Sequence, residues 1–238
     1  MRTPDPVATT ATSGADLTSG PPLGTPVPPP DSPYWLFYDE VAAAQLTQWL
    51  PAEPSRVLDV SGGGRFAGQV AAAGHSVVHG ADEPDPVDLV LAESRALSMS
   101  LATEVTLDQL VRVLRPGGRL LLVVESLLLG LARLAEQGRW AELADAPSAD
   151  VVLVPGADGT MTRCFWPEDL RSLLVDAGLE VEWVRPRTVL TPATVERALS
   201  SGGAAALRTL VRTELALAAE REGESTGLHL VASARKPG

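Results

Sequence analysis

Short runs of β-branched or leucine-rich residues alternate with stretches of helical periodicity along most of this chain. The runs predict strands at residues 56–60, 75–79, 87–91, 119–125, 179–185 and 227–234. Apolar positions spaced by three or four residues predict helices at residues 39–50, 64–73, 103–114, 127–140, 167–177 and 192–222. Strands that alternate with helices are typical of a mostly parallel sheet covered on both faces, so the pattern predicts a doubly wound α/β fold.

The first 32 residues differ from the rest of the chain. They are rich in proline, threonine, serine and glycine and contain no aromatic residue, whereas aromatic residues begin at Tyr34. A segment of this composition buries too little apolar surface to offset its ordering entropy. We therefore expect a disordered tail over residues 1–32 and one domain over residues 33–238, a length that suits a single core.

Charge and composition narrow the classes of function. The net charge of −11 opposes binding to nucleic acid, which requires lysine and arginine to displace phosphate counterions. The single cysteine, Cys164, excludes an internal disulfide and a zinc site of several cysteines, and the three histidines form no ligand motif, so no metal is expected. No apolar run is long enough to span a bilayer and no secretory signal is visible, so we expect a cytoplasmic protein without a membrane partner.

The most informative segment is residues 57–67, where a strand leads through a glycine-rich turn into a helix. Glycines in such a turn let the backbone approach a flat ligand closely. Gly62, Gly64 and Ala67 also fit the dinucleotide fingerprint, which is a weak pattern. Asp59 precedes these glycines, and its carboxylate would repel a pyrophosphate but attract a cationic cofactor.

This segment resembles motif I of the class I S-adenosylmethionine-dependent methyltransferases, and further segments resemble the family in its order. Residues 110–120 are similar to the helix, turn and strand that close its central sheet. Residues 167–184 resemble its penultimate helix and strand, and residues 227–232 resemble its last, antiparallel strand. The resemblance covers about residues 35–236 and implies a Rossmann-like sheet with S-adenosylmethionine as cofactor.

The resemblance also implies a set of site residues. The methionine part of the cofactor would lie against Asp59, Ser61, Gly62, Gly63 and Gly64. Asp82 would bind the ribose hydroxyls, and Tyr38, placed just before the first helix, would cover the cofactor. Glu93, followed by Ser94, would lie close to the transferred methyl group and is the candidate general base.

Plainer interpretations of the same residues stay open. Asp59 is also explained as a local cap, and the glycines as an ordinary tight turn. Asp82 lies in an acidic loop and is also explained by solvation, while Tyr38 is also explained as part of the core.

Two departures from the family pattern affect the expected site. Ser61 and Arg65 stand where the family usually has glycine. Only residues 80–86 separate the second predicted strand from the next, where the family inserts a helix, a strand and another helix. The sequence therefore predicts a sheet that lacks one edge βα unit, and a more open cofactor pocket that buries less of its ligand.

Three hypotheses of function follow. The first is methyl transfer to a small-molecule or protein acceptor, in which the chain mainly positions the reactants and residues 160–166 line the acceptor pocket. The second is a binding module of the same fold without catalysis. The third is an NAD(P)-dependent oxidoreductase, supported by the glycine pattern alone. In the first hypothesis, Cys164 is interpreted as a small buried hydrophobic residue.

Overall fold

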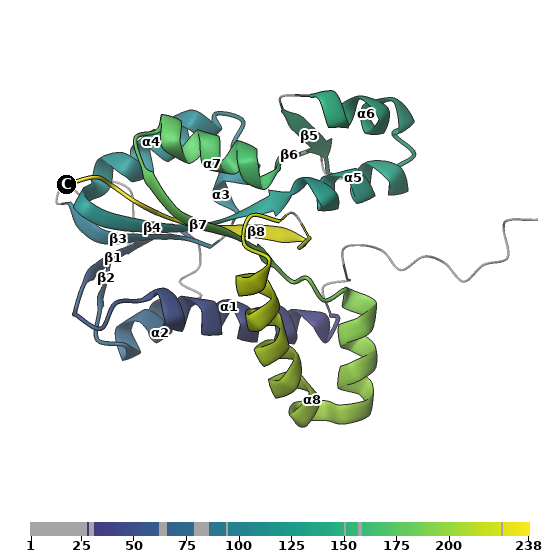
Figure 1. The fold of residues 1–238 in the computed structure, drawn as a ribbon, viewed down its shortest axis with the longest axis horizontal. Coiled ribbons are helices and arrows are strands. Elements are labelled where there is room, and N and C mark those ends of the chain that lie inside the picture. Colours follow the sequence, from purple (N-terminus) through teal and green to yellow (C-terminus); the bar gives the residue numbers. More distant parts are fainter. Residues whose placement is uncertain are drawn as a thin grey trace, which may run out of the picture.

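One mixed sheet forms the centre of the molecule, and helices cover both of its faces (Figure 1). The computed structural model describes residue 28 and residues 31–61, 66–78, 86–93, 95–149, 151–156, 159–224 and 226–238. Its strands are β1 (Arg56–Asp59), β2 (Ser76–Val78), β3 (Val87–Ala92), β4 (Leu114–Ser126), β5 (Val152–Pro155), β6 (Met161–Phe165), β7 (Glu180–Arg187) and β8 (His229–Arg235). Its helices are α1 (Tyr34–Trp49), α2 (Ala67–Ala72), α3 (Ala96–Met99), α4 (Thr103–Val113), α5 (Leu127–Glu136), α6 (Trp140–Asp145), α7 (Pro167–Asp176) and α8 (Pro192–Glu220), with a 3-10 turn at Ala146–Ser148.

The strand order confirms the predicted sheet. Strands β2, β1, β3 and β4 lie side by side in this order and pair in parallel. On its other side β4 pairs with β8 in antiparallel register, and β8 pairs antiparallel with β7. Strand β7 therefore runs in the direction of β4, and β8 is the antiparallel last strand that the sequence predicts.

The predicted loss of one edge unit is also confirmed. Among the described strands β2 pairs with β1 alone, so β2 forms the edge of the sheet. Only residues 79–86 connect β2 with β3. A segment of this length is too short for a helix, a strand and a second helix, each of which normally takes several residues.

The two faces of the sheet have separate apolar layers. Helices α1, α2 and α8 lie on one face, and α3, α4 and α7 on the other (Figure 1). Side chains alternate between these layers along each strand. Val57, Leu91 and Val123 pack on the α1 side, whereas Leu58 and Leu122 pack on the α4 side.

The first helix begins earlier than the periodicity predicts. It starts at Tyr34 instead of residue 39, so Tyr38 lies inside the helix and not before it. The hydroxyl of Ser32 accepts a hydrogen bond from the backbone N–H of Tyr34 at 3.0 Å. Tyr34 and Phe37 are fully buried in a cluster with residues of α8, and this tertiary packing explains why the aromatic run is helical.

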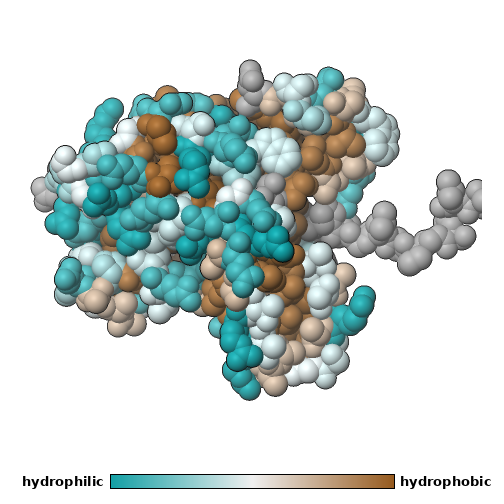
Figure 2. Space-filling view, viewed as in Figure 1, coloured by the Kyte–Doolittle hydropathy of each residue, from teal (hydrophilic) through white to brown (hydrophobic). Residues whose placement is uncertain are grey.

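The segment after β4 contains elements that the sequence pattern did not predict. The helix expected over residues 127–140 ends at Glu136, and Gly138 adopts a φ of 67° before α6 begins. The following hairpin of β5 and β6 joins the end of β4, where Glu125 pairs in parallel with Cys164. This unit has a small core of its own, and Figure 2 shows hydrophobic residues exposed over it at the upper right.

The predicted helix over residues 192–222 is a hairpin of two helical arms (Figure 1). The chain turns back at Gly203, whose φ of 50° and ψ of −136° lie outside the helical region. Such a φ is readily adopted only by glycine. Both arms contribute to the cluster that buries the aromatic residues of α1.

Candidate functional site

A row of polar side chains ends the apolar layer on the α1 side of the sheet. Four members, Asp59, Glu93, Glu125 and His229, stand two residues beyond a buried position of that layer, so side-chain alternation places them on the same face. In the strand register Asp59 lies opposite Leu91, Glu125 opposite His229, and His229 opposite Arg187. This polar row consists of Asp59, Glu93, Glu125, His229 and Arg187, and it lies at the carboxyl ends of the parallel strands, where doubly wound sheets bind ligands.

Asp59 has one oxygen that is buried without a partner. Its Oδ1 accepts a hydrogen bond from the backbone N–H of Ser61 at 2.9 Å. Its Oδ2 is buried and has no hydrogen-bond partner among the described residues. A buried carboxylate oxygen left in this state is costly, so the site suits a ligand that brings a cationic hydrogen-bond donor.

Ser61 connects the turn after β1 with the end of β3. Its hydroxyl accepts a hydrogen bond from the backbone N–H of Glu93 at 2.9 Å. The same hydroxyl lies 3.4 Å from the backbone oxygen of Leu91, to which it donates. The side chain that replaces a family glycine is therefore part of the local structure of the site.

Arg187 and Glu93, two members of the row, form a fully buried ion pair. The Nη1 and Nη2 atoms of Arg187 donate to both carboxylate oxygens of Glu93, at 2.5 and 2.9 Å, and the two side chains are 0% and 3% exposed. Its Nε donates to Oε1 of Gln45 at 2.6 Å, and its guanidinium lies 5.6 Å from the ring of Tyr38. Burial alone would lower the pKa of Arg187, but the adjacent Glu93 carboxylate and Tyr38 raise it overall.

This ion pair bears on the expectation that Glu93 is a general base. Both carboxylate oxygens of Glu93 already accept from the buried guanidinium of Arg187, and removing one partner of a buried ion pair is strongly unfavourable. The geometry therefore favours a positioning role for Glu93, in which it holds Arg187 against Tyr38 and Gln45.

Two further arginines converge on Glu125. Arg95 donates from Nη1 to one oxygen of Glu125 at 2.6 Å, and Arg133 donates from Nη1 to the other. The Glu125 side chain is 2% exposed, whereas those of Arg95 and Arg133 are 40% and 21% exposed. Arg95 has a φ of 59°, a conformation that is costly for a residue other than glycine and that occurs at functional sites.

His229 lies between the two groups of charges. Its ring packs edge-on against Tyr38 at a centroid distance of 5.3 Å, and its Nδ1 is buried without a partner among the described residues. Burial, together with the positive charges of Arg95, Arg187 and Arg133, lowers the pKa of His229 well below its ordinary value. The imidazole is therefore neutral in the folded protein at neutral pH.

The lowered pKa of His229 predicts a loss of stability in mild acid. In the unfolded chain the pKa of this histidine returns to about 6.5. Above that pH the imidazole of His229 is neutral in both the folded and the unfolded chain, and below it only the unfolded chain takes up the proton. The free energy of unfolding should fall by about 1 kcal/mol between pH 7 and pH 5.5 on this account. Urea unfolding at both pH values should show this fall in the wild type and a smaller fall in His229→Gln. Equal falls in the two proteins would show that His229 does not cause the loss of stability.

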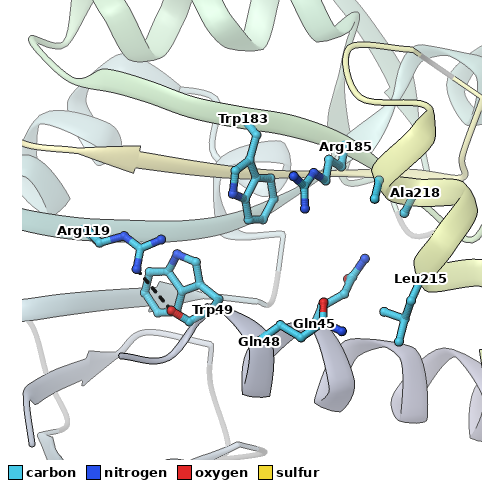
Figure 3. A pocket seen from close by; sticks show the side chains of 9 residues that line it. Gln45, Gln48, Trp49, Arg119, Trp183, Arg185, Leu215 and Ala218 are labelled. Carbon is cyan, nitrogen blue, oxygen red and sulfur yellow. Dashed lines mark hydrogen bonds between the residues drawn. The ribbon is translucent and has the colours of Figure 1, made fainter. Parts of the chain in front are cut away.

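Two cavities near the sheet differ in size. One of ≈ 120 Å³ lies between α1, β7 and α8 and is lined by Trp49, Trp183, Gln45 and Arg185, among others (Figure 3). This is below the about 300 Å³ at which ligand pockets begin. A second, of ≈ 380 Å³, lies between β1 and α4, and its lining includes Val60, Ala96, Thr106, Gln109 and Leu110. Only the second reaches the size of a cofactor subsite.

Comparison with protein-family models and with curated proteins finds no match. Solved structures do match. The N1-methyltransferase for 1,6-didemethyltoxoflavin of Burkholderia thailandensis, solved with S-adenosylhomocysteine, is 16% identical and has a TM-score of 0.52, covering 87% of this chain and 82% of its own. A possible histamine N-methyltransferase of Thermotoga maritima is 19% identical with a TM-score of 0.50, covering 85% and 90%. This chain has the class I S-adenosylmethionine-dependent methyltransferase fold.

A third match supports the same fold. It is a putative S-adenosylmethionine-dependent methyltransferase from Listeria monocytogenes, 13% identical with a TM-score of 0.51, covering 83% of this chain and 99% of its own. The resemblance on motif I and the later segments is thus confirmed for the methyltransferase fold. The polar row of this chain lies at the end of the sheet where β1 leads into the segment that resembles motif I.

The methyltransferase fold brings several of the sequence-predicted residues together. Asp59, Ser61 and Glu93 are linked by hydrogen bonds, and Tyr38 contacts the Arg187 that pairs with Glu93. Gly62, Gly63, Gly64, Asp82 and Ser94 lie outside the described residues.

Cys164 is buried at the end of β6, next to Glu125 in the register. Burial and the nearby negative charge of Glu125 raise the pKa of its thiol to about 12. The group therefore stays protonated and packs as a small hydrophobic residue. The expectation that residues 160–166 line an acceptor pocket stays a prediction.

Two findings in the described part of the chain concern metal ions and membranes. No group of three or more histidine, cysteine or acidic residues within it is placed to hold a metal ion. Within the same part, no helix combines the length and the hydrophobicity needed to cross a membrane.

Sequence reasoning missed several residues of the site: Gln45, Arg95, Glu125, Arg133, Arg187 and His229. A signal for some of them was present. In β4 the inward positions Leu121 and Val123 are followed by Glu125, and in β8 Val231 is preceded by His229. A charged or polar residue that continues an apolar alternation at a strand end indicates a buried polar position.

Proposed function

We propose that this chain transfers a methyl group from S-adenosylmethionine to a small-molecule or protein acceptor. The observation that carries the proposal is Asp59, whose Oδ2 is buried without a partner among the described residues. The α-ammonium of the cofactor's methionine part would satisfy this oxygen, and its sulfonium would also favour the negative charge. Bound in this way, the cofactor supplies an electrophilic methyl group for in-line attack by the acceptor.

The chain's own residues would act by positioning. Ser61 fixes the turn after β1 through Glu93, and Glu93 fixes Arg187. We propose that Gly62, Gly63 and Gly64 complete the contact with the methionine part, that Asp82 binds the ribose, and that Tyr38 closes one side. A reaction of this kind gains mainly from orientation of the reactants.

The cavity between β1 and α4 supports a place for the adenine ring. It adjoins Val60, next to Asp59 in the chain, and its lining is largely aliphatic. Thr106 and Gln109 provide a hydroxyl and an amide at its wall. We propose that the lost edge unit leaves this cavity open and that the adenine packs there against α4.

Calorimetric titration of the full chain tests the function. S-adenosylmethionine and S-adenosylhomocysteine should bind with micromolar affinity, a usual range for cofactors, and NADH should not bind. Radiolabelled S-adenosylmethionine offered with a panel of small molecules and proteins should then yield a labelled product. Binding without any transfer would favour a non-catalytic module. Saturable binding of NADH in place of the sulfonium cofactor would favour the oxidoreductase.

A further inference from the structure

The polar row carries neighbouring groups of opposite charge. Asp59, at the end of β1, has a carboxylate oxygen without a partner among the described residues. At the end of β4, Arg95 and Arg133 share one carboxylate, that of Glu125. We call Arg95, Arg133 and Glu125 the basic end, because they meet at the carboxyl end of β4.

The charges of the described groups do not cancel at the basic end. Arg187 is neutralised by Glu93, and His229 is neutral because its pKa is lowered. Arg95 and Arg133 together carry two positive charges, and Glu125 supplies one negative charge. Among the described residues one positive charge is therefore left without a partner there, in a chain whose net charge is −11.

Arg95 and Arg133 also have hydrogen-bond donors that the described residues do not use. The described contacts of Arg95 and Arg133 use Nη1 of each, and no hydrogen bond from their Nε or Nη2 is found among the described residues. Each guanidinium has five N–H donors in a planar fork that fits a carboxylate. The two side chains are 40% and 21% exposed, so a ligand can reach them. Nδ1 of the buried His229, which has no partner in the described part of the chain, lies close by.

We propose that the methyl acceptor carries a carboxylate, which binds to Arg95 and Arg133 beside His229. The inference rests on the proposed methyl transfer. S-adenosylmethionine carries one net positive charge, which Asp59 would balance, so the spare positive charge of the basic end favours an acceptor with a single negative charge. A carboxylate brings this charge, whereas a doubly charged phosphate monoester would exceed it.

The test uses ligand-observed NMR on the full chain, with and without saturating S-adenosylhomocysteine. The probes are benzoate, cinnamate and indole-3-acetate, each compared with its primary amide. The variant Arg95→Gln removes one guanidinium while Arg133 still neutralises Glu125, so folding is retained. The control Arg235→Gln removes an exposed arginine that pairs with Glu180 near the other end of β8.

The carboxylates should bind in preference to their amides, Arg95→Gln should weaken them by about tenfold, and Arg235→Gln should leave them unchanged. Equal binding of carboxylates and amides, or binding that Arg95→Gln does not alter, would overturn the proposal. So would an equal loss of S-adenosylhomocysteine affinity in Arg95→Gln, because the basic end would then hold the cofactor's own carboxylate. If S-adenosylhomocysteine does not bind but Arg95-dependent carboxylate binding persists, the anion site stands and methyl transfer falls.

Discussion

Replacement of Asp59 by asparagine should weaken the binding of S-adenosylmethionine by at least about tenfold. The variant keeps an oxygen that can accept from the N–H of Ser61, so the turn is preserved. It loses the negative charge that would meet the ammonium and the sulfonium. The free energy of unfolding should not fall, because Oδ2 has no partner to lose among the described residues and the substitution removes a buried charge. Calorimetry and urea unfolding measure the two quantities.

Asp88→Asn is the matched control for this experiment. Asp88 is in β3, accepts from the N–H of Arg56 at 2.6 Å and pairs with Arg115, near the end of the sheet opposite the polar row. Its removal should leave cofactor affinity unchanged. Wild-type affinity in Asp59→Asn would show that this carboxylate does not hold the cofactor, and a loss of both affinity and stability would indicate a structural role.

The strands of the central sheet could be predicted because each is a short apolar run with its own local pattern. The edge unit could be recognised as missing from the length of the connection between two strands, since residues 79–86 leave no room for it. The hairpin of β5 and β6 could not be predicted in the same way. Its strands are short, and β6, to which β5 pairs, is stabilised by pairing with the end of β4, far away in the sequence.

Helix ends depended on tertiary contacts in a similar manner. The first turns of α1 are helical because Tyr34 and Phe37 bury against α8. The turn within α8 could have been predicted from the sequence, since Gly202 and Gly203 form a glycine pair and Gly203 takes the positive φ.

The candidate site was predicted in part. Asp59, Ser61 and Glu93 belong to segments that a local motif marks, and the structure brings them together. Arg187 could not be assigned to them, because its contact with Glu93 joins residues separated by 94 positions in the chain. Such long-range pairs are determined by strand order and register, which a single sequence does not reveal.

Arg187→Met should cost about 3–5 kcal/mol of unfolding free energy. The substitution leaves the carboxylate of Glu93, 3% exposed, without its counter-ion and removes the donor to Gln45. The double variant Glu93→Leu, Arg187→Met removes both charges and should be much more stable than Arg187→Met alone, since a buried ion pair is often replaced by apolar residues at little cost. Urea unfolding of the wild type, both single variants and the double variant gives the coupling energy directly.

Arg185→Met provides the comparison, because Arg185 pairs with Glu222 where the side chains are 32% and 39% exposed. An ion pair at that exposure contributes about 1 kcal/mol or less. A cost for Arg187→Met no greater than that for Arg185→Met would contradict a buried ion pair within the polar row. Glu93 would then be free to contact a substrate, and the general-base role implied by the family resemblance would regain its support. A large coupling energy instead ties Glu93 to Arg187, because both carboxylate oxygens then serve the guanidinium.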